Sequence, residues 1–215
     1  AGKRIVFVNF SGAAIALEPE SLNCEAILQA WYPGQAGGQA VAEVLFGDYN
    51  PAGKLPLTFY RNLAQIPDFE DYNMTGRTYR YMKETPLFPF GHGLSYTTFK
   101  YGKLKMNDDK IAVGQNLNLV IPVTNTGSRD GDEVVQVYLK KMDDTEGPVK
   151  TLRAFKRVRI PAGKTVEVKF SLDDTQLEWW DEQSNTMRVC PGNYTVMIGG
   201  TSCEKSLLSR AFTIR

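Results

Sequence analysis

The sequence predicts an α+β protein in which a partial α/β layer is followed by an antiparallel β sandwich. Before residue 99, apolar strand-like runs alternate with one helical pattern, and glycine and proline turns separate them. After residue 99, apolar and polar residues alternate in about seven short segments with turn residues between them, a pattern typical of a sandwich.

The first half is expected to begin with two strands and a helix. Residues 5–8 (IVFV) and 26–31 (AILQAW) are apolar runs typical of strands. After a glycine pair, apolar positions recur at helical spacing with Glu43 turned outward, and Gly47 suits the C-cap of that helix. The helical positions are Ala40, Val41, Val44 and Leu45.

Two further elements of the first half are less regular. Residues 11–20 (SGAAIALEPE) are interpreted as a short helix that ends at Pro19, since proline interrupts helices. Leu55 and Leu57 follow a turn rich in Asp, Asn, Pro and Gly, and they are expected to begin a third, short strand.

The middle of the chain is predicted to be irregular but packed. Residues 61–84 combine acidic and aromatic side chains in a long loop, for which interdomain packing is favoured over ligand contact. Residues 87–95 (LFPFGHGLS) are too apolar for a free linker and are expected to lie in an interface. His92 has no Ser, Cys or metal partner nearby, so a structural role is favoured over a catalytic one.

The second half carries the sandwich strands. Period-two alternation predicts strands at 117–123, 135–139, 166–172, 194–198 and 212–214, and residues 150–159 are interpreted as a strand with a basic, solvated face. Of the Trp179-Trp180 pair, one indole is expected in the core and the other at the sheet edge, in preference to a sugar-stacking platform.

Composition excludes several classes of protein. The 215 residues carry a formal net charge of +1 with mixed signs, which argues against a nucleic-acid partner. No apolar run is long enough to cross a membrane, and no signal peptide begins the sequence, which enters a strand directly and is expected to be cut from something longer. One histidine makes a zinc site improbable, and no cofactor is expected. Of three cysteines, Cys190 and Cys203 are expected as free thiols, with a disulfide as the alternative.

Two long motifs resemble a known family. Residues 31–59 (WYPGQAGGQAVAEVLFGDYNPAGKLPLTF) and 86–99 (PLFPFGHGLSYTTF) closely resemble the C-terminal portion of glycoside hydrolase family 3 enzymes, the β-glucosidases and β-xylosidases. Residues 123–139 (VTNTGSRDGDEVVQVYL) look like the fibronectin type III-like module that follows in many members. A departure is Ala36, where many members carry Glu, although no catalytic role depends on it.

The resemblance implies that the catalytic acids lie outside this sequence. In the family, an Asp nucleophile belongs to a preceding barrel domain, and the acid/base is commonly a Glu upstream of the WYPGQ-like segment. The candidate substitutes within the sequence are the carboxylates at positions 43, 48, 68, 70 and 71 (Glu43, Asp48, Asp68, Glu70, Asp71). None is expected to pair across a cleft, as glycoside hydrolysis requires. No catalytic, cofactor-binding or metal-binding residue is therefore nominated.

The resulting expectation is a two-domain C-terminal portion of a retaining β-glycosidase. Residues 1–98 would end the family's α/β sandwich domain, and 99–215 would be the fibronectin type III-like, immunoglobulin-like sandwich. The substrate would be an oligosaccharide with terminal β-D-glucosyl or β-D-xylosyl residues, held through the missing N-terminal domains, in the periplasm or outside the cell. The motif GRTYRYM leans toward xylosidases.

Other expectations concern the isolated chain. It should not turn over aryl β-glycosides, and Trp31→Ala should cost roughly 3–5 kcal/mol if the indole is buried. The alternatives are a non-catalytic carbohydrate-binding sandwich that uses Trp179, Trp180 and the aromatic residues of 72–81, or an interaction module that stabilises oligomers. The sequence leaves open whether the protein is a homodimer.

Overall fold

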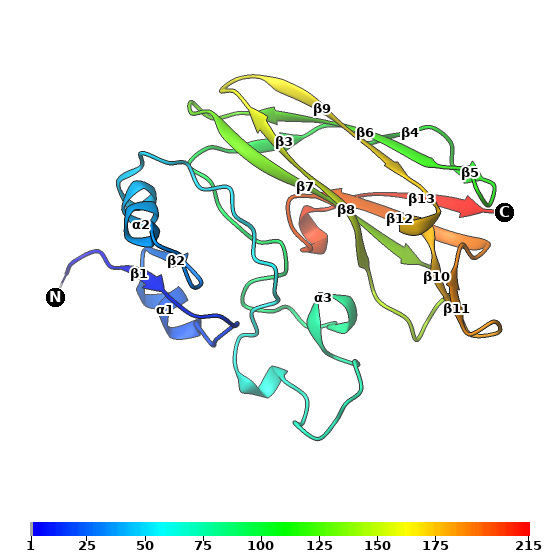
Figure 1. The fold of residues 1–215 in the computed structure, drawn as a ribbon, viewed down its shortest axis with the longest axis horizontal. Helices are drawn as coiled ribbons and strands as arrows, with labels where there is room; N and C mark the ends of the chain where they lie inside the picture. The colour runs from blue at the N-terminus through cyan, green and yellow to red at the C-terminus, as the bar shows by residue number, and fades with distance from the viewer. Residues whose placement is uncertain (1) are drawn as a thin grey trace.

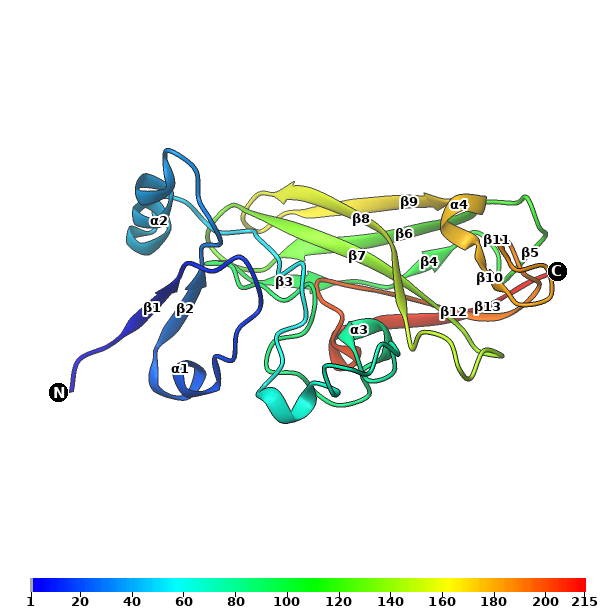
Figure 2. The ribbon, with the colours of Figure 1, turned by 60° about the horizontal axis from the view of Figure 1, so that its bottom comes forward.

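The structure is a computed structural model, and it describes residues 2–215. A β sandwich forms the larger part, while a small α/β unit and irregular segments lie beside one end of it (Figures 1 and 2). In both views the N-terminal segment and the C-terminus lie at opposite ends of the molecule. This arrangement agrees with the predicted α+β class.

The secondary structure is mostly strand. The strands are β1 Val6–Asn9, β2 Ala26–Gln29, β3 Phe99–Tyr101, β4 Lys105–Met106, β5 Lys110–Ile111, β6 Leu117–Asn125, β7 Gly131–Lys141, β8 Thr151–Ile160, β9 Thr165–Leu172, β10 Trp179–Asp181, β11 Thr186–Arg188, β12 Gly192–Gly199 and β13 Leu208–Ile214. The helices are α1 Glu18–Asn23, α2 Gly37–Phe46, α3 Thr78–Tyr81 and α4 Asp174–Leu177, with 3-10 turns at Leu63–Gln65 and Glu204–Ser206. No helix in residues 2–215 combines the length and apolarity that a membrane crossing needs.

Two sheets make the sandwich. One has the strand order β5-β13-β12-β7-β8, in which only the short β5 runs parallel to its neighbour. In the other, β6 pairs antiparallel with β9 and with the short strands β3 and β4. The β10–β11 hairpin closes one end, and β1 and β2 form a separate parallel pair.

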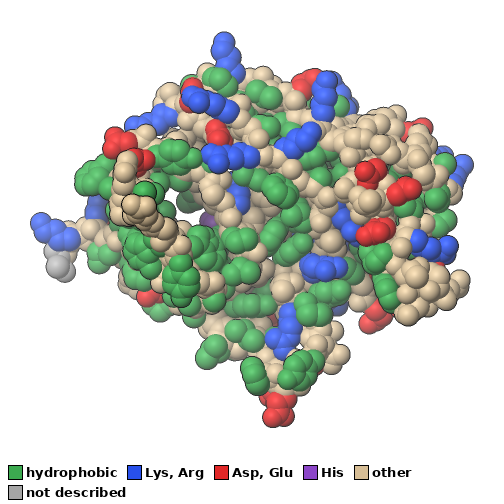
Figure 3. Space-filling view, viewed as in Figure 1, with side chains coloured by type: hydrophobic (Ala, Val, Ile, Leu, Met, Phe, Trp, Pro, Cys, Tyr) green, Lys and Arg blue, Asp and Glu red, His purple; other side chains and the backbone are tan. Residues whose placement is uncertain are grey.

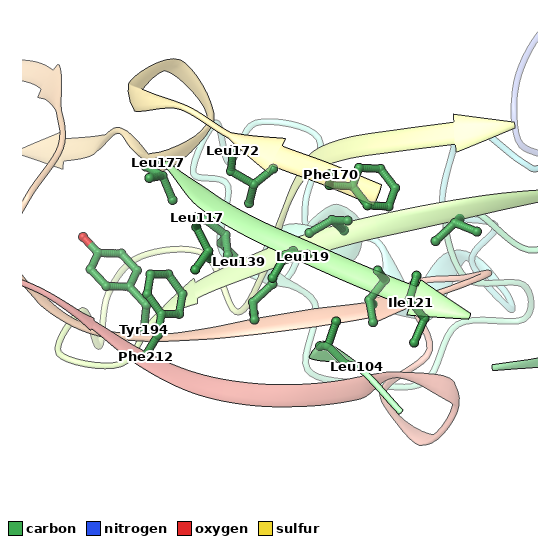
Figure 4. Close-up of a cluster of buried hydrophobic side chains, with 14 of the residues drawn as sticks. Leu104, Leu117, Leu119, Ile121, Leu139, Phe170, Leu172, Leu177, Tyr194 and Phe212 are labelled. Carbon is green, nitrogen blue, oxygen red and sulfur yellow. The ribbon is translucent and has the colours of Figure 1, made fainter. Parts of the chain in front are cut away.

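The core lies between the two sheets, as Figure 4 shows. The inward residues of β6 are fully buried while their neighbours are more exposed, so the predicted alternation over 117–123 is confirmed. The facing sheet contributes Tyr194, Phe212 and Leu139, and the rings of Tyr194 and Phe212 stack at 5.5 Å. Trp179 is 3% exposed and Trp180 is 49% exposed, which confirms the expected division of that pair.

Two predictions for the first half were wrong. Pro19 lies in the first turn of α1 instead of ending a helix, because its fixed φ and missing N–H suit a helix start. Leu55 and Leu57 begin no strand. The facing segment is interrupted by Pro86 and Pro89, which cannot donate to a ladder, and only an isolated bridge between Phe59 and Phe88 forms.

The helix predicted after the glycine pair is confirmed as α2. Gly47 follows it with φ 82°, the left-handed conformation in which glycine is preferred at a helix end. Trp31 is half-buried and lies edge-on to Phe59 at 6.2 Å. The expected cost of Trp31→Ala assumed a buried indole, and the structure meets that condition only in part.

All three cysteines are free thiols. Cys190 is buried, and Cys24 and Cys203 are half-buried. The alternative of a disulfide between Cys190 and Cys203 is not realised.

Candidate functional site

The acidic residues on and after α2 are surface groups. Oε1 of Glu43 accepts a hydrogen bond from Nε2 of Gln39, one helical turn away, at 2.7 Å. Asp48 lies exposed in the turn that follows the helix. Neither carboxylate lines either of the two hollows described below.

The acidic residues of the 61–84 loop organise the loop itself. Asp68 accepts a hydrogen bond from the backbone N–H of Glu70, and Asp71 from that of Asn73, both at 2.9 Å. Hydrogen bonds from Asn73 lower the pKa of Asp71 below its ordinary value; the bond from the backbone N–H has the larger effect and the bond from the side chain the smaller. A carboxyl held ionised in this way is unsuited to the general-acid step of glycoside hydrolysis.

A polar cluster around the buried Glu133 joins the first half of the chain to the sandwich. Nζ of Lys54 lies 3.3 Å from Oε1 of Glu133 on β7, and it also donates to the carbonyl of Gly93 at 3.0 Å. The hydroxyl of Tyr101 donates to the same Glu133 oxygen at 3.3 Å. We call Lys54, His92, Tyr101 and Glu133 the junction cluster; all four line a hollow of about 430 Å³.

Burial governs the charge of the junction cluster. It raises the pKa of Glu133, against the opposite influence of Lys54, and it raises the pKa of Tyr101, so the phenol stays a donor. The cluster brings together a single carboxylate, whereas glycosidases of the usual kind use two. Its geometry fits a structural clamp.

His92 belongs to this clamp through packing. Its ring stacks on Phe88 with centroids 5.3 Å apart, and its carbonyl accepts a hydrogen bond from the N–H of Leu55 at 2.8 Å. Burial, followed by the charge of Lys54, lowers the pKa of His92 and keeps the imidazole neutral at pH 7. These contacts agree with the structural role favoured from the sequence.

The crossover of residues 87–95 is fixed by hydrogen bonds on both sides. Gly91 donates to the carbonyl of Leu55 at 2.7 Å, and its own carbonyl accepts from Nε2 of Gln136 at 3.3 Å. The N–H of Ser202 donates to the carbonyl of Phe90 at 3.0 Å. The expected interface is confirmed for this stretch, although Leu94 is 78% exposed.

The first half of the chain exposes a large apolar surface. Among residues 2–215, 17 of the 23 exposed large apolar side chains precede residue 97. They include Phe46 on α2 and Phe69 and Tyr72 in the loop, which are between 84% and 90% exposed. In Figure 3 many hydrophobic (green) side chains lie on the side of the molecule that carries the small α/β unit and on the loop at the bottom of the view. Large apolar surfaces of this kind are typical of sites at which proteins contact a partner or a further domain.

Comparison with known proteins shows which family the chain belongs to. Residues 1–96 match the model of the glycosyl hydrolase family 3 C-terminal domain, and residues 133–202 match the fibronectin type III-like domain. The chain belongs to glycoside hydrolase family 3. The assignment made from the sequence motifs is confirmed.

Relatives within family 3 match nearly the whole chain. A xylan 1,4-β-xylosidase of Xylanibacter ruminicola is 53% identical over 214 residues, which are 100% of this chain and 24% of that protein. A periplasmic β-glucosidase of Salmonella typhimurium is 38% identical over 94% of this chain and 28% of its own length. A β-xylosidase of Formosa agariphila is 38% identical over 100% of this chain and 30% of its length.

Solved family 3 structures share the fold. A β-glucosidase from Erythrobacter marinus has a TM-score of 0.84 at 38% identity, covering 98% of this chain and 28% of that one. A β-glucosidase from Listeria innocua in complex with isofagomine has a TM-score of 0.85 at 27% identity, covering 99% and 31%. The chain thus spans between 24% and 31% of the length of these relatives.

Sequence reasoning missed the junction cluster. Lys54, Tyr101 and Glu133 are far apart in the sequence, and no local pattern links them. The available signal was Glu133 itself, which stands in the inward register of Val135 and Val137 on β7. A carboxylate in an inward register requires a partner.

Proposed function

We propose that this chain is the C-terminal portion of a retaining β-glycosidase that releases terminal, non-reducing β-D-glucosyl or β-D-xylosyl residues from oligosaccharides. The two reacting carboxylates would belong to other parts of the protein, which would also hold the substrate. Residues 1–98 would complete an α/β domain, and residues 99–215 would support it. The names of the relatives favour this reaction, and that of the Salmonella relative favours a periplasmic or secreted location.

The observation that carries the proposal is the exposed apolar surface of the first half. A two-stranded parallel sheet and one amphipathic helix cannot cover each other, because parallel sheets are ordinarily covered on both faces. Phe46 is 84% exposed at the end of α2, where further sheet and helices would bury it.

Activity is tested with the complete gene product and the 215-residue chain, each assayed on aryl β-D-xylosides and aryl β-D-glucosides. We expect turnover by the complete product and none by the chain alone. Turnover by the chain alone would overturn the proposal, as would an inactive complete product. Light scattering on the same samples measures whether the protein is a homodimer.

Two matched substitutions test the proposed covering. Phe46→Ser on α2 and Phe155→Ser on β8 both alter strongly exposed rings, at 84% and 65%. In the 215-residue chain we expect both to change the free energy of unfolding by less than about 0.5 kcal/mol. In the complete product only Phe46→Ser should destabilise, by about 3 kcal/mol or more. Equal effects of the two substitutions there would contradict the proposal.

A further inference from the structure

A second hollow, of about 720 Å³, lies near the end of the sandwich that the β10–β11 hairpin closes. Its walls come from α3, the segment that follows β7, the start of β8 and the hairpin. We call it the two-arginine pocket, after Arg80 on α3 and Arg153 on β8. It contains none of the five acidic residues or the junction cluster described above.

Neither of the two arginines forms a direct ion pair within residues 2–215. Neither guanidinium has a carboxylate oxygen within 4.0 Å among the described residues. Burial is the larger cause that lowers the pKa of Arg153, and the nearby positive charge of Arg80 lowers it further. Arg153 donates from Nη2 to the carbonyl of Glu178 at 2.7 Å, and its guanidinium lies 5.2 Å from the Trp179 ring centroid. Nε of each arginine is buried without a hydrogen-bond partner.

A hydroxyl group beside the arginines also lacks a partner. Thr151 lines the pocket, is only 9% exposed, and has a buried Oγ1 that makes no hydrogen bond within the described chain. Buried polar groups in native proteins are normally satisfied by protein, water or a ligand. Three residues that line this one hollow, Arg80, Thr151 and Arg153, each carry such an unsatisfied atom, which favours a ligand rich in hydrogen-bond acceptors.

Most acidic residues of the pocket are already engaged. Asp144 accepts from Nε1 of Trp179 and from the N–H of Gly147, both at 2.6 Å. Asp181 pairs with Arg188 at 2.7 Å. Asp143 likewise accepts from a backbone N–H of β12 at 3.0 Å. None of these three carboxylates forms an ion pair with Arg80 or Arg153.

The remaining wall offers an aromatic face. Trp180 is 49% exposed and lines the pocket beside the engaged carboxylates. Tryptophan presents a flat apolar surface with a polar tip. Glu146 and Glu182 also line the pocket, where carboxylate oxygens can accept hydrogen bonds from sugar hydroxyls.

We propose that the two-arginine pocket binds a saccharide that carries a carboxylate, that is, a uronic acid residue. Guanidinium groups recognise planar carboxylates through paired hydrogen bonds, and Trp180 would stack on the sugar ring. The volume lies within the range of small-ligand sites. The inference does not depend on the proposed hydrolase activity, because it uses only residues of the sandwich and α3.

The test is a titration of the 215-residue chain at low ionic strength, in which calorimetry or NMR monitors binding. The probes are methyl β-D-glucuronide and methyl β-D-glucoside, which differ only in the carboxylate, and sodium acetate as a bare carboxylate. We expect the glucuronide to bind at least ~10-fold more tightly than either of the others, since a charge-assisted hydrogen bond is worth that much or more.

Variants assign the binding to the pocket. Arg80→Gln, Arg153→Gln and the nearly isosteric Thr151→Val should each weaken glucuronide binding, the arginine variants at least ~10-fold. Arg159→Gln, at an exposed position on the same strand as Arg153, should leave binding unchanged. Near-ultraviolet circular dichroism of every variant shows that the fold is retained.

Several results would overturn the inference. The glucuronide and the glucoside could bind equally, acetate could bind as tightly as the glucuronide, or Thr151→Val and Arg80→Gln could both leave binding intact in a folded protein. Absence of glucuronide binding to the unaltered chain would have the same meaning.

Discussion

The ammonium group of Lys54 lies 3.3 Å from the carboxylate of Glu133, with the two side chains 15% and 6% exposed. Lys54 follows the turn after α2, and Glu133 faces inward near the start of β7. This ion pair helps to connect the small α/β unit to the sandwich, in surroundings where either charge alone would be costly.

Removing the cation should destabilise the protein strongly. Lys54→Met leaves Glu133 buried without its partner, and we expect the free energy of unfolding to fall by about 3–5 kcal/mol. Arg159→Met breaks the exposed pair with Asp130 and should cost less than about 1 kcal/mol. Urea unfolding of both variants measures the difference, and equal losses would show that the junction pair is solvated in practice.

The same carboxyl predicts a pH dependence. Burial raises the pKa of Glu133 in the folded protein above its usual 4.5, so between these two values the folded state binds more protons than the unfolded state. The contribution of Glu133 to the free energy of unfolding is therefore full at pH values below its pKa in the unfolded state. This contribution is lost as the pH rises through its pKa in the folded state. Glu133→Gln should gain stability relative to the unaltered protein as pH rises above about 4.5. Unfolding curves at several pH values test this, and parallel curves would refute it.

Gly91 should resist substitution more than another left-handed glycine. It has φ 78°, and a Cβ there would collide with Oε1 of Gln136, whereas Gly163 has φ 68° with open space around it. Gly163→Ala should cost about 1–2 kcal/mol for the backbone alone. Gly91→Ala should cost about 1–3 kcal/mol more, because the side chain of Gln136 must also move. Thermal unfolding of the two variants would contradict this if their midpoints matched.

The adjacent tryptophans should differ in their contribution to stability. Trp179→Ala removes a buried indole and its hydrogen bond to Asp144, and we expect a loss of about 3–5 kcal/mol. Trp180→Ala alters a ring that is half exposed and should change the free energy of unfolding by less than about 1 kcal/mol. Chemical denaturation gives both values, and a large effect at Trp180 would place that ring in the core.

The sandwich was predictable because its strands are half-buried. Alternation in β6 and β9 reports which face meets the core, and this signal needs no knowledge of the partner strand. The strands that sequence reasoning missed, such as β4 and β5, are two residues long and carry no period. Their pairing is decided by the neighbouring strands.

The first half was harder to predict, since its segments depend on contacts distant in the sequence. Leu55 looked like a strand residue, but its backbone bonds to His92 in a segment that cannot extend a ladder. Pro19 was interpreted as the end of a helix, whereas proline also suits a first helical turn, and the position of α1 shows that it has this second role. The two-arginine pocket likewise joins α3, β8 and the β10–β11 hairpin, which no local pattern connects.

The crossover that carries Phe90 and Gly91 has a mechanical consequence. Its backbone is bonded to residue 55 on one side and to Gln136 and Ser202 on the other, so no free linker remains at which the two parts could swivel. We therefore expect the sandwich and the α/β unit to move together as one rigid body. A molecule bound at the end of the sandwich far from α2 would therefore keep a fixed orientation relative to whatever covers α2.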